Sequence, residues 1–260
     1  MLLSMFLYEN MALEGLTDQF LDLTLGNAHY LPFCPPEDVK RTLRSLNDIP
    51  HYLFRVFTPE SCGITDRSWA KSMDARHTTE DHDKDIFARA GKSQVAAMVN
   101  AHLRWYTSSS DNLVSWTSSL LFALVYIFYL RANTRDGSAF ENISVCIVDT
   151  TCFPPGVFIQ DLDLIRAYKS SNSELASFET LRSKKHRSLS GHFYFGEYLS
   201  QGALRIKENC EVVSSRALID RGLYDLLPEL KSFAHWKPQR TPQWANPVVE
   251  LRCGSAKGQQ

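Results

Sequence analysis

The chain has 260 residues, a formal net charge of −1 and a hydrophobic share of 44%. These values argue against intrinsic disorder for most of the chain. They also provide no overall positive field that would attract nucleic acid or an anionic membrane. The longest apolar run, residues 120–130, is shorter than the roughly 20 residues that cross a bilayer.

The first residues of the chain and the spacing of its cysteines predict where in the cell the protein is found. The apolar start MLLSMFLYEN lacks the basic region of a signal peptide. The six cysteines form no C-x-x-C pair, and none stands beside histidines at zinc-site spacing. We therefore expect reduced thiols in a cytoplasmic or nuclear protein with no metal site and no membrane partner.

In chain order, the first 48 residues predict a helical N-terminal extension, because apolar residues recur on one helical face. A proline-rich break follows at 31–36, and Pro36 with two acidic residues after it favours a short helix. Residues 52–57 (YLFRVF) predict a strand that is apolar except for Arg55. Residues 58–92 are polar and charged, so we expect a long surface excursion.

The middle of the chain predicts a helix at 93–106, a strand at 113–115, an apolar helix at 120–130, a turn at 133–137, a strand at 143–148 and a helix at 162–168. We expect the apolar helix to be almost completely buried. Beyond a Ser- and Lys-rich stretch at 169–190, short strands are predicted near 192–198, 203–206 and 211–214, followed by a helix at 217–230. The proline-rich sequence after Trp236 predicts little structure.

This order predicts an α+β fold, since helices and strands do not alternate regularly. We divide the chain into a helical extension (1–48), a central domain (49–232) and a largely irregular C-terminal tail (233–260). The candidate site residues all fall in the central domain.

Arg55 is the first candidate. An arginine in an apolar strand is costly unless its guanidinium reaches a carboxylate, a phosphate or water. One interpretation is an anion clamp, most naturally for a phosphate or pyrophosphate. The alternative is an arginine on the solvent face of the strand or in a structural ion pair.

The second candidate is a hydroxyl cluster, Ser115-Trp116-Thr117-Ser118-Ser119. Helix starts favour Ser and Thr because their oxygens accept hydrogen bonds from backbone N–H groups, so Ser118 or Thr117 is expected to cap the apolar helix. Capping does not account for every hydroxyl of the cluster, and Ser115 is the one that we expect to face a cleft.

The third candidate is Glu197, a lone carboxylate in an aromatic strand. Its neighbour Gly196 has no side chain, which would let a ligand approach closely. The alternative is a glutamate at a strand edge that faces water.

Other motifs are set aside. Gly91-Lys92-Ser93 lacks the earlier glycine of a P-loop, because Ile86 stands there. The histidines and acids of 77–85 lie in polar sequence without clear ligand spacing and are interpreted as solvated surface. The basic run 184–187 is interpreted in the same way rather than as a nucleic-acid site.

The ordered set resembles the Arg-Ser-Glu class of ADP-ribosyltransferases, that of cholera-type toxins and related mono-ADP-ribosyltransferases. Leu53-Phe54-Arg55-Val56 resembles the first motif, Ser115-Trp116-Thr117 the Ser-Thr-Ser motif, and Glu197-Tyr198-Leu199 the third. The chain is also similar to a fungal domain family of unknown function with LFRV, SWTSS and EYLSQG landmarks. The resemblance spans roughly residues 50–230 and implies a split β-sheet core.

The resemblance implies that NAD+ is the substrate. Glu197 would accept a hydrogen bond from the 2′-OH of the nicotinamide ribose and stabilise the oxocarbenium-like transition state as nicotinamide leaves. Ser115 would orient Glu197, and Arg55 would hold a phosphate or the adjoining ribose. Thr117 would belong to the binding motif, and Trp116 or Tyr198 would stack on an aromatic ring of NAD+ unless they pack in the core.

Phe195 stands where many active members of that class carry Glu or Gln to engage the acceptor side chain. The outcome is therefore open between transfer of ADP-ribose to a protein or nucleic acid, hydrolysis of NAD+, and a catalytically inactive binding module. In all three cases Arg55, Ser115 and Glu197 should converge on one cleft, with Ser115 within hydrogen-bond reach of Glu197. In a different α+β fold they would lie on separate faces.

Overall fold

Two antiparallel sheets form the centre of the computed structural model, which describes residues 29–41, 43, 48–106, 108–183, 194–238 and 245–257. The larger sheet has the strand order β6-β7-β4-β1-β5-β9, and the smaller one β2-β3-β8. The strands of the larger sheet are β1 (Tyr52–Phe57), β4 (Leu113–Thr117), β5 (Ser144–Asp149), β6 (Ile159–Gln160), β7 (Glu197–Gln201) and β9 (Cys210–Ser214). Those of the smaller sheet are β2 (Ile64–Thr65), β3 (Trp69–Lys71) and β8 (Ala203–Arg205).

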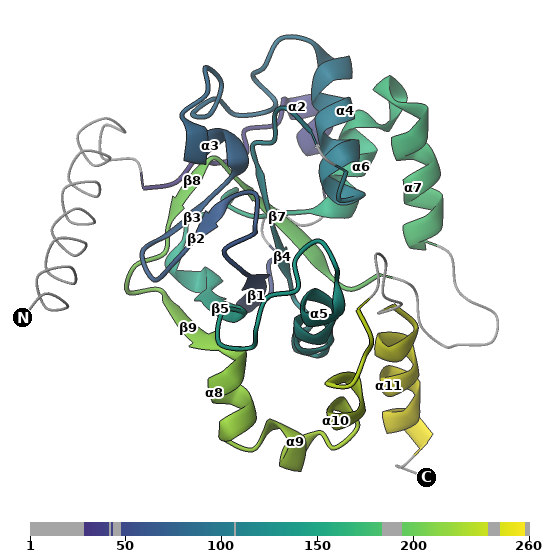
Figure 1. Cartoon of the computed structure of the whole chain (residues 1–260). Helices are drawn as coiled ribbons and strands as arrows, with labels where there is room; N and C mark the ends of the chain where they lie inside the picture. Colours follow the sequence, from purple (N-terminus) through teal and green to yellow (C-terminus); the bar gives the residue numbers. More distant parts are fainter. Residues whose placement is uncertain are drawn as a thin grey trace, which may run out of the picture.

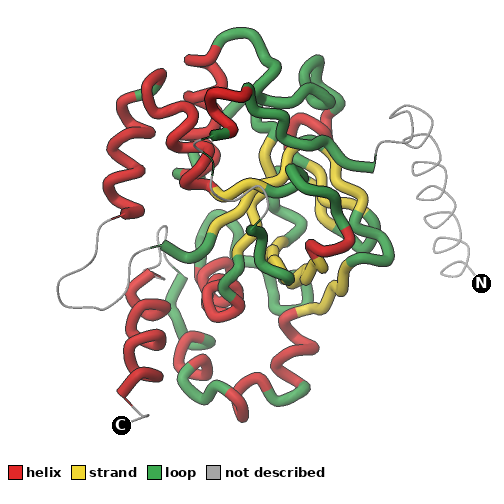
Figure 2. The backbone as a smooth tube through the Cα atoms, turned by 180° about the vertical axis from the view of Figure 1, so that it is seen from behind, coloured by secondary structure: helices red, strands yellow, loops and turns green. Residues whose placement is uncertain are grey.

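Two groups of helices cover these sheets, and Figure 1 shows them above and below the strands. The upper group contains α4 (Lys92–Leu103), α6 (Asp161–Tyr168) and α7 (Ser173–Ser183), and the lower one α5 (Leu120–Ala132), α8 (Ser215–Asp220), α9 (Leu223–Leu226), α10 (Leu230–Phe233) and α11 (Ala245–Lys257). Short helices also occur at α2 (Glu37–Lys40), α3 (Met73–His77), η1 (Thr150–Cys152) and η2 (Lys169–Ser171). The view from behind shows the same arrangement (Figure 2). The predicted α+β class is confirmed.

The larger sheet is weakly joined between β1 and β4. These strands share a single residue pair, Phe54 opposite Thr117, whereas β1 pairs with β5 along its whole length. Past Phe54 the two strands part, and the guanidinium of Arg55 reaches across to the backbone carbonyl of Ser115. This opening in the sheet is where the pocket described below is found.

The apolar helix α5 packs its buried residues, among them Ile127 and Phe128, in the lower core. It is less buried than the sequence predicts, because Phe122 and Tyr126 are half-buried and line the pocket. Its N-cap is Ser119, whose Oγ accepts from the backbone N–H of Phe122 at 3.2 Å. The prediction of Ser118 or Thr117 as the cap is therefore wrong.

The surface excursion predicted at 58–92 is wrong in part. The segment contains β2, β3 and α3, and Trp69, Ala70 and Ile86 are buried. The side chain of Gln201 ties it to the sheet, since Oε1 accepts from the backbone N–H of Ile86 and Nε2 donates to Asp85. The polar composition of the segment did not indicate these contacts, because many of its polar groups form hydrogen bonds with one another.

The C-terminal region also differs from the prediction. The helix predicted at 217–230 is broken into α8 and shorter pieces at Gly222, whose φ of 95° lies in the left-handed region. The tail predicted to be irregular contains α11, and both Val248 and Val249 are buried in the lower core. Apolar burial against α5 thus outweighs the proline-rich composition.

Several predicted elements are confirmed with small shifts in their ends. The strands predicted at 52–57, 143–148 and 211–214, and the helices predicted at 93–106 and 162–168, correspond to β1, β5, β9, α4 and α6. The Ser- and Lys-rich stretch carries α7, which the sequence did not predict. Residues 1–28 of the predicted helical extension lie outside the described residues, as do residues 192 and 193 of the predicted strand near 192–198.

Replacing Val249 with Ala tests whether α11 is part of the core. The side chain is 1% exposed, so the substitution should lower the free energy of unfolding by about 2 kcal/mol, measured by urea denaturation. Glu250→Ala is the control, because Glu250 is exposed on the same helix. Equal stabilities of the two variants would show that α11 does not pack on the domain.

Candidate functional site

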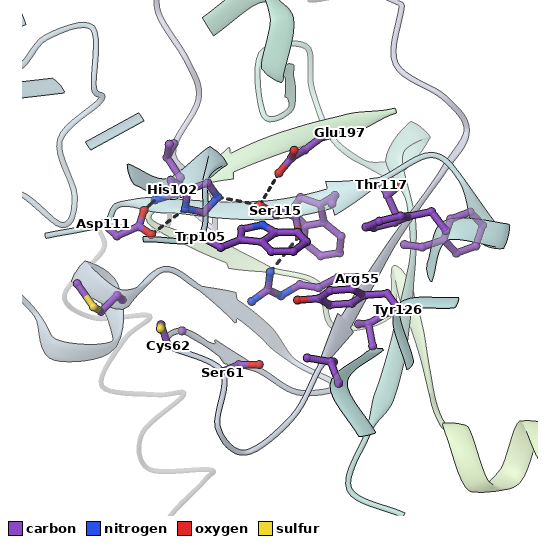
Figure 3. A pocket seen from close by; sticks show the side chains of 18 of the residues that line it. Arg55, Ser61, Cys62, His102, Trp105, Asp111, Ser115, Thr117, Tyr126 and Glu197 are labelled. Carbon is purple, nitrogen blue, oxygen red and sulfur yellow. Dashed lines mark hydrogen bonds and ion pairs between the residues drawn. The ribbon is translucent and has the colours of Figure 1, made fainter. Parts of the chain in front are cut away.

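A pocket of about 330 Å³ lies where β1 and β4 part. Among its polar lining residues are Arg55, His102, Asp111, Ser115, Arg182 and Glu197, and Glu60, Ser61, Lys71, Thr117 and Asp136 also line it. Aromatic rings from α5 and from the end of α4 form much of the remaining wall. Figure 3 shows Arg55, His102, Ser115 and Glu197 converging from β1, the end of α4, β4 and β7.

Ser115 and Glu197 are joined across neighbouring strands. Strand β4 pairs with β7 so that Thr117 lies opposite Glu197 and Ser115 opposite Leu199. Ser115 and Glu197 are therefore diagonal neighbours on one face of the sheet. The Ser115 hydroxyl donates to Oε1 of Glu197 at 2.9 Å, which confirms the predicted convergence and contact.

Arg55 lies half-buried beside this pair. Its Nε donates to Oγ1 of Thr65 at 2.9 Å and its Nη1 to the backbone carbonyl of Ser115 at 3.0 Å. Burial lowers the pKa of the guanidinium, which nevertheless remains charged. The hydrogen bonds to Thr65 and Ser115 use Nε and Nη1 of Arg55 and do not involve its Nη2. Arg55 thus closes the gap in the sheet and places positive charge in the pocket wall.

His102 and Asp111 complete the polar cluster, and sequence analysis missed both. Nε2 of His102 lies 2.8 Å from Oγ of Ser115, and Nδ1 lies 2.7 Å from Oδ2 of Asp111. Burial works against the charged imidazole, but the charge and hydrogen bond of Asp111, helped by Glu197, outweigh it and raise the pKa of His102. In the sequence, the sole signal was a single histidine in the last turn of a predicted helix.

A buried carboxylate fixes the position of Asp111. Oδ1 of Asp74 accepts from the backbone N–H of Asp111 at 3.0 Å, and the backbone N–H of Asp74 donates back to the carbonyl of Asp111. Asp74 is fully buried on α3. Oδ1 of Asp111 accepts from the backbone N–H of Leu113, so Oδ2 is directed at His102. The polar segment 58–92 therefore helps to build the site.

Arg182 on α7 lies between two carboxylates. Its Nη2 donates to Oε2 of Glu197 at 2.6 Å, and its Nη1 lies 3.6 Å from Oδ2 of Asp161. Asp161 is fully buried. Burial raises its pKa to about 7, although the charge of Arg182 opposes the shift.

Trp116 and Tyr198 lie on the opposite face of the sheet. They face each other across β4 and β7 and belong to the core between the two sheets. The indole of Trp116 is 2% exposed and donates to Oγ of Ser200 at 2.9 Å, and Tyr198 is 7% exposed. Both rings thus pack in the core, which was the alternative to stacking on NAD+, although Trp116 also forms part of the pocket lining.

Thr117 lines the pocket, but its hydroxyl has a structural role. It donates to the backbone carbonyl of Phe195 at 2.6 Å and accepts from the backbone N–H of Ser119 at 3.1 Å. The side chain thus joins the start of α5 to the chain just before Glu197.

Gly196 makes room for the protein rather than for a ligand. Its φ is 66°, and a Cβ atom here would stand 2.0 Å from Oγ of Ser118. Next to it, the ring of Phe195 stacks on Phe122 at 5.2 Å and lies 5.1 Å from the guanidinium carbon of Arg252 on α11. These contacts hold in place the segment of chain that leads into Glu197.

Trp105 and Tyr126 form the most prominent aromatic wall, with ring centroids 5.5 Å apart. Trp105 lines the pocket together with Arg55 and Ser115 (Figure 3). Trp105 is 45% exposed, and its φ of 58° is unusual for a bulky residue. Such strained backbone is found preferentially at functional sites.

Among the described residues there is no group of three His, Cys, Asp or Glu side chains that could hold a metal ion. No helix in the described ranges is long and apolar enough to cross a membrane. The basic run 184–187 lies outside the described residues.

Comparison with known proteins assigns a family. Residues 48–204 match the family model described as Domain of unknown function (DUF7587). Because the match covers more than half of the chain, the protein belongs to this family. No curated protein and no solved structure matches the chain, so its activity has to be inferred from the site.

Replacing Asp161 with Asn tests the buried carboxyl. Between about pH 4 and 7, the folded protein keeps a proton that the unfolded chain has lost, so this group's contribution to the free energy of unfolding falls as the pH rises. Between pH 5 and 8 the wild type should lose about 3 kcal/mol relative to Asp161→Asn. Urea denaturation at the two pH values measures this difference.

Asp149, whose side chain is partly exposed, gives a control for that comparison. The free energy of unfolding of Asp149→Asn should fall as the pH rises, as in the wild type, whereas Asp161→Asn should lose this fall. A trend that is identical in the wild type and in Asp161→Asn would contradict the raised pKa.

Proposed function

We propose that this pocket binds NAD+ and that the protein cleaves its nicotinamide–ribose bond, passing ADP-ribose to a macromolecule or to water. The observation that carries the proposal is the 2.9 Å hydrogen bond between Ser115 and Glu197, located in a pocket beside Arg55. The sequence resemblance to Arg-Ser-Glu ADP-ribosyltransferases rests on these three residues.

Glu197 is suited to stabilise a developing positive charge. One oxygen accepts from Ser115 and the other from Arg182, yet a carboxylate has about four lone-pair sites. A lone pair on either oxygen can therefore still accept from the 2′-OH of the nicotinamide ribose. As the C–N bond breaks, the negative charge beside the ribose favours the oxocarbenium-like transition state.

The remaining pocket fits the nicotinamide–ribose half of NAD+. Its volume of about 330 Å³ is at the low end of the roughly 300–1,000 Å³ usual for ligand pockets, so we assign the adenosine half to the mouth. Nη2 of Arg55 supplies donors for a phosphate. The indole of Trp105 supplies a stacking surface for a planar, cationic nicotinamide ring.

The second candidate function is a binding module without catalysis. Phe195 is 5% exposed and is stacked on Phe122, so it presents no polar group to an acceptor side chain. Arg182 also holds Glu197 in a 2.6 Å ion pair. Both observations fit a pocket that binds a nucleotide and leaves it intact.

Glu197→Gln separates the two functions. The substitution keeps the shape of the side chain and removes its charge, so release of nicotinamide from NAD+ should fall about 10²- to 10³-fold with little change in NAD+ affinity. Nicotinamide is quantified by chromatography, and affinity by calorimetric titration. Glu211→Gln is the control, because Glu211 is an exposed glutamate on another strand, β9.

Each outcome of that experiment has a distinct meaning. NAD+ binding without nicotinamide release by the wild type would support the binding module. If the wild type neither binds NAD+ nor releases nicotinamide, the proposal is wrong.

Trp105→Ala tests the stacking surface. Base–aromatic stacking contributes about 1–3 kcal/mol, so the dissociation constant for NAD+ should rise about 5- to 150-fold. Tyr52→Ala is the control, since Tyr52 is also an exposed aromatic residue, at 48%, and lies outside the pocket. Equal affinities of the two variants would remove Trp105 from the binding site.

A further inference from the structure

We infer that His102, oriented by Asp111, is a positioning residue that makes the Ser115 hydroxyl donate its proton to Glu197. The inference deepens the proposed function and rests on it. It assigns a role to two residues that neither the sequence motifs nor the family description identifies. In Figure 3 the four side chains form one continuous chain of hydrogen bonds.

The directions of the hydrogen bonds follow from counting protons. The Ser115 hydroxyl has one proton and two neighbours, Oε1 of Glu197 at 2.9 Å and Nε2 of His102 at 2.8 Å. An ionised carboxylate can accept but cannot donate. Ser115 therefore donates to Glu197, and Nε2 of His102 has to carry a hydrogen that it donates to Ser115.

The same argument applies on the other side of the imidazole ring. Oδ2 of Asp111 lies 2.7 Å from Nδ1 of His102, so Nδ1 also carries a hydrogen when Asp111 is ionised. Both ring nitrogens are then donors, and the ring is a cation between two anions. When His102 loses a proton, Nε2 becomes an acceptor and competes with Glu197 for the proton of Ser115.

The surroundings of His102 favour this charged form. The charged groups that act on the ring are Asp111 from the loop before β4, Glu197 from β7 and Arg55 from β1. The two acids stabilise the cation and Arg55 opposes it. The side chain of His102 is 10% exposed, so these charges are little screened by water.

The spacing from Asp111 through His102 to Ser115 is also that of a Ser-His-Asp hydrolase. In such an enzyme the serine gives its proton to a neutral histidine and a negative charge then develops beside it. Here Glu197 lies within 2.9 Å of the same hydroxyl, and its charge would repel that developing negative charge. The observations therefore favour a role in positioning, and hydrolysis is an outcome of the test.

The first experiment needs no activity. The full chain is labelled with ¹³C-histidine, and the titration of each ring is followed by NMR; the signal that is missing in His102→Gln belongs to His102. We expect the pKa of His102 to fall in Asp111→Asn and in Glu197→Gln. The control is Asp149→Asn, which removes the partly exposed carboxylate 3.3 Å from His51 and should leave the pKa of His102 unchanged. An unchanged His102 in all three variants would overturn the inference.

The second experiment measures nicotinamide release between pH 5 and 9. In Asp111→Asn we expect kcat at pH 8 to be about 10- to 100-fold lower than in the wild type, the effect of losing a hydrogen bond to a charged group, with recovery at low pH. The KM should change little. A uniform loss at every pH would mean a structural role and would contradict the inference.

The two experiments fail separately. If the NMR titration behaves as expected but no nicotinamide is released, the hydrogen-bond network stands and the proposed function fails. Labelling of Ser115 by a fluorophosphonate that is lost in His102→Gln would replace the positioning role with nucleophilic catalysis.

Discussion

One hydroxyl proton determines how this site can work. Ser115 lies between Glu197 and His102, at 2.9 and 2.8 Å, and it can donate to one of them at a time. The proton goes to Glu197 while His102 is charged, and the charge of His102 depends on Asp111. The carboxylate proposed to act on NAD+ is therefore oriented by a residue that belongs to neither strand of the Ser–Glu pair.

The fold provides the space for this arrangement by leaving its larger sheet incompletely paired. Strands β1 and β4 share one residue pair, and Arg55 bridges the remaining gap through the carbonyl of Ser115. Segments on both sides then fix the functional groups. Asp74 holds the loop that carries Asp111, and Arg252 of α11 donates to the backbone carbonyl of Tyr194, three residues before Glu197. Parts of the chain that look dispensable in the sequence thus support the pocket.

Sequence reasoning predicted most strands and helices of the central domain, and it predicted the meeting of Ser115 and Glu197. For their neighbours Trp116 and Tyr198 it left stacking on NAD+ and core packing open, and the two-residue period of a strand would have favoured the opposite face for both rings. The contact between His102 and Asp111 could not be predicted. It depends on how the end of α4 meets the loop before β4, and no periodic pattern encodes such a meeting. The helix α11 was missed because proline-rich composition says nothing about the apolar surface that a helix will find.

The most direct test of the account is a crystal structure of the Glu197→Gln variant grown with NAD+. The account predicts an intact dinucleotide with the 2′-OH of its nicotinamide ribose within hydrogen-bond distance of residue 197. It also predicts the nicotinamide ring against Trp105 and a phosphate at Arg55. NAD+ bound outside this pocket, or with its nicotinamide ribose turned away from residue 197, would contradict it.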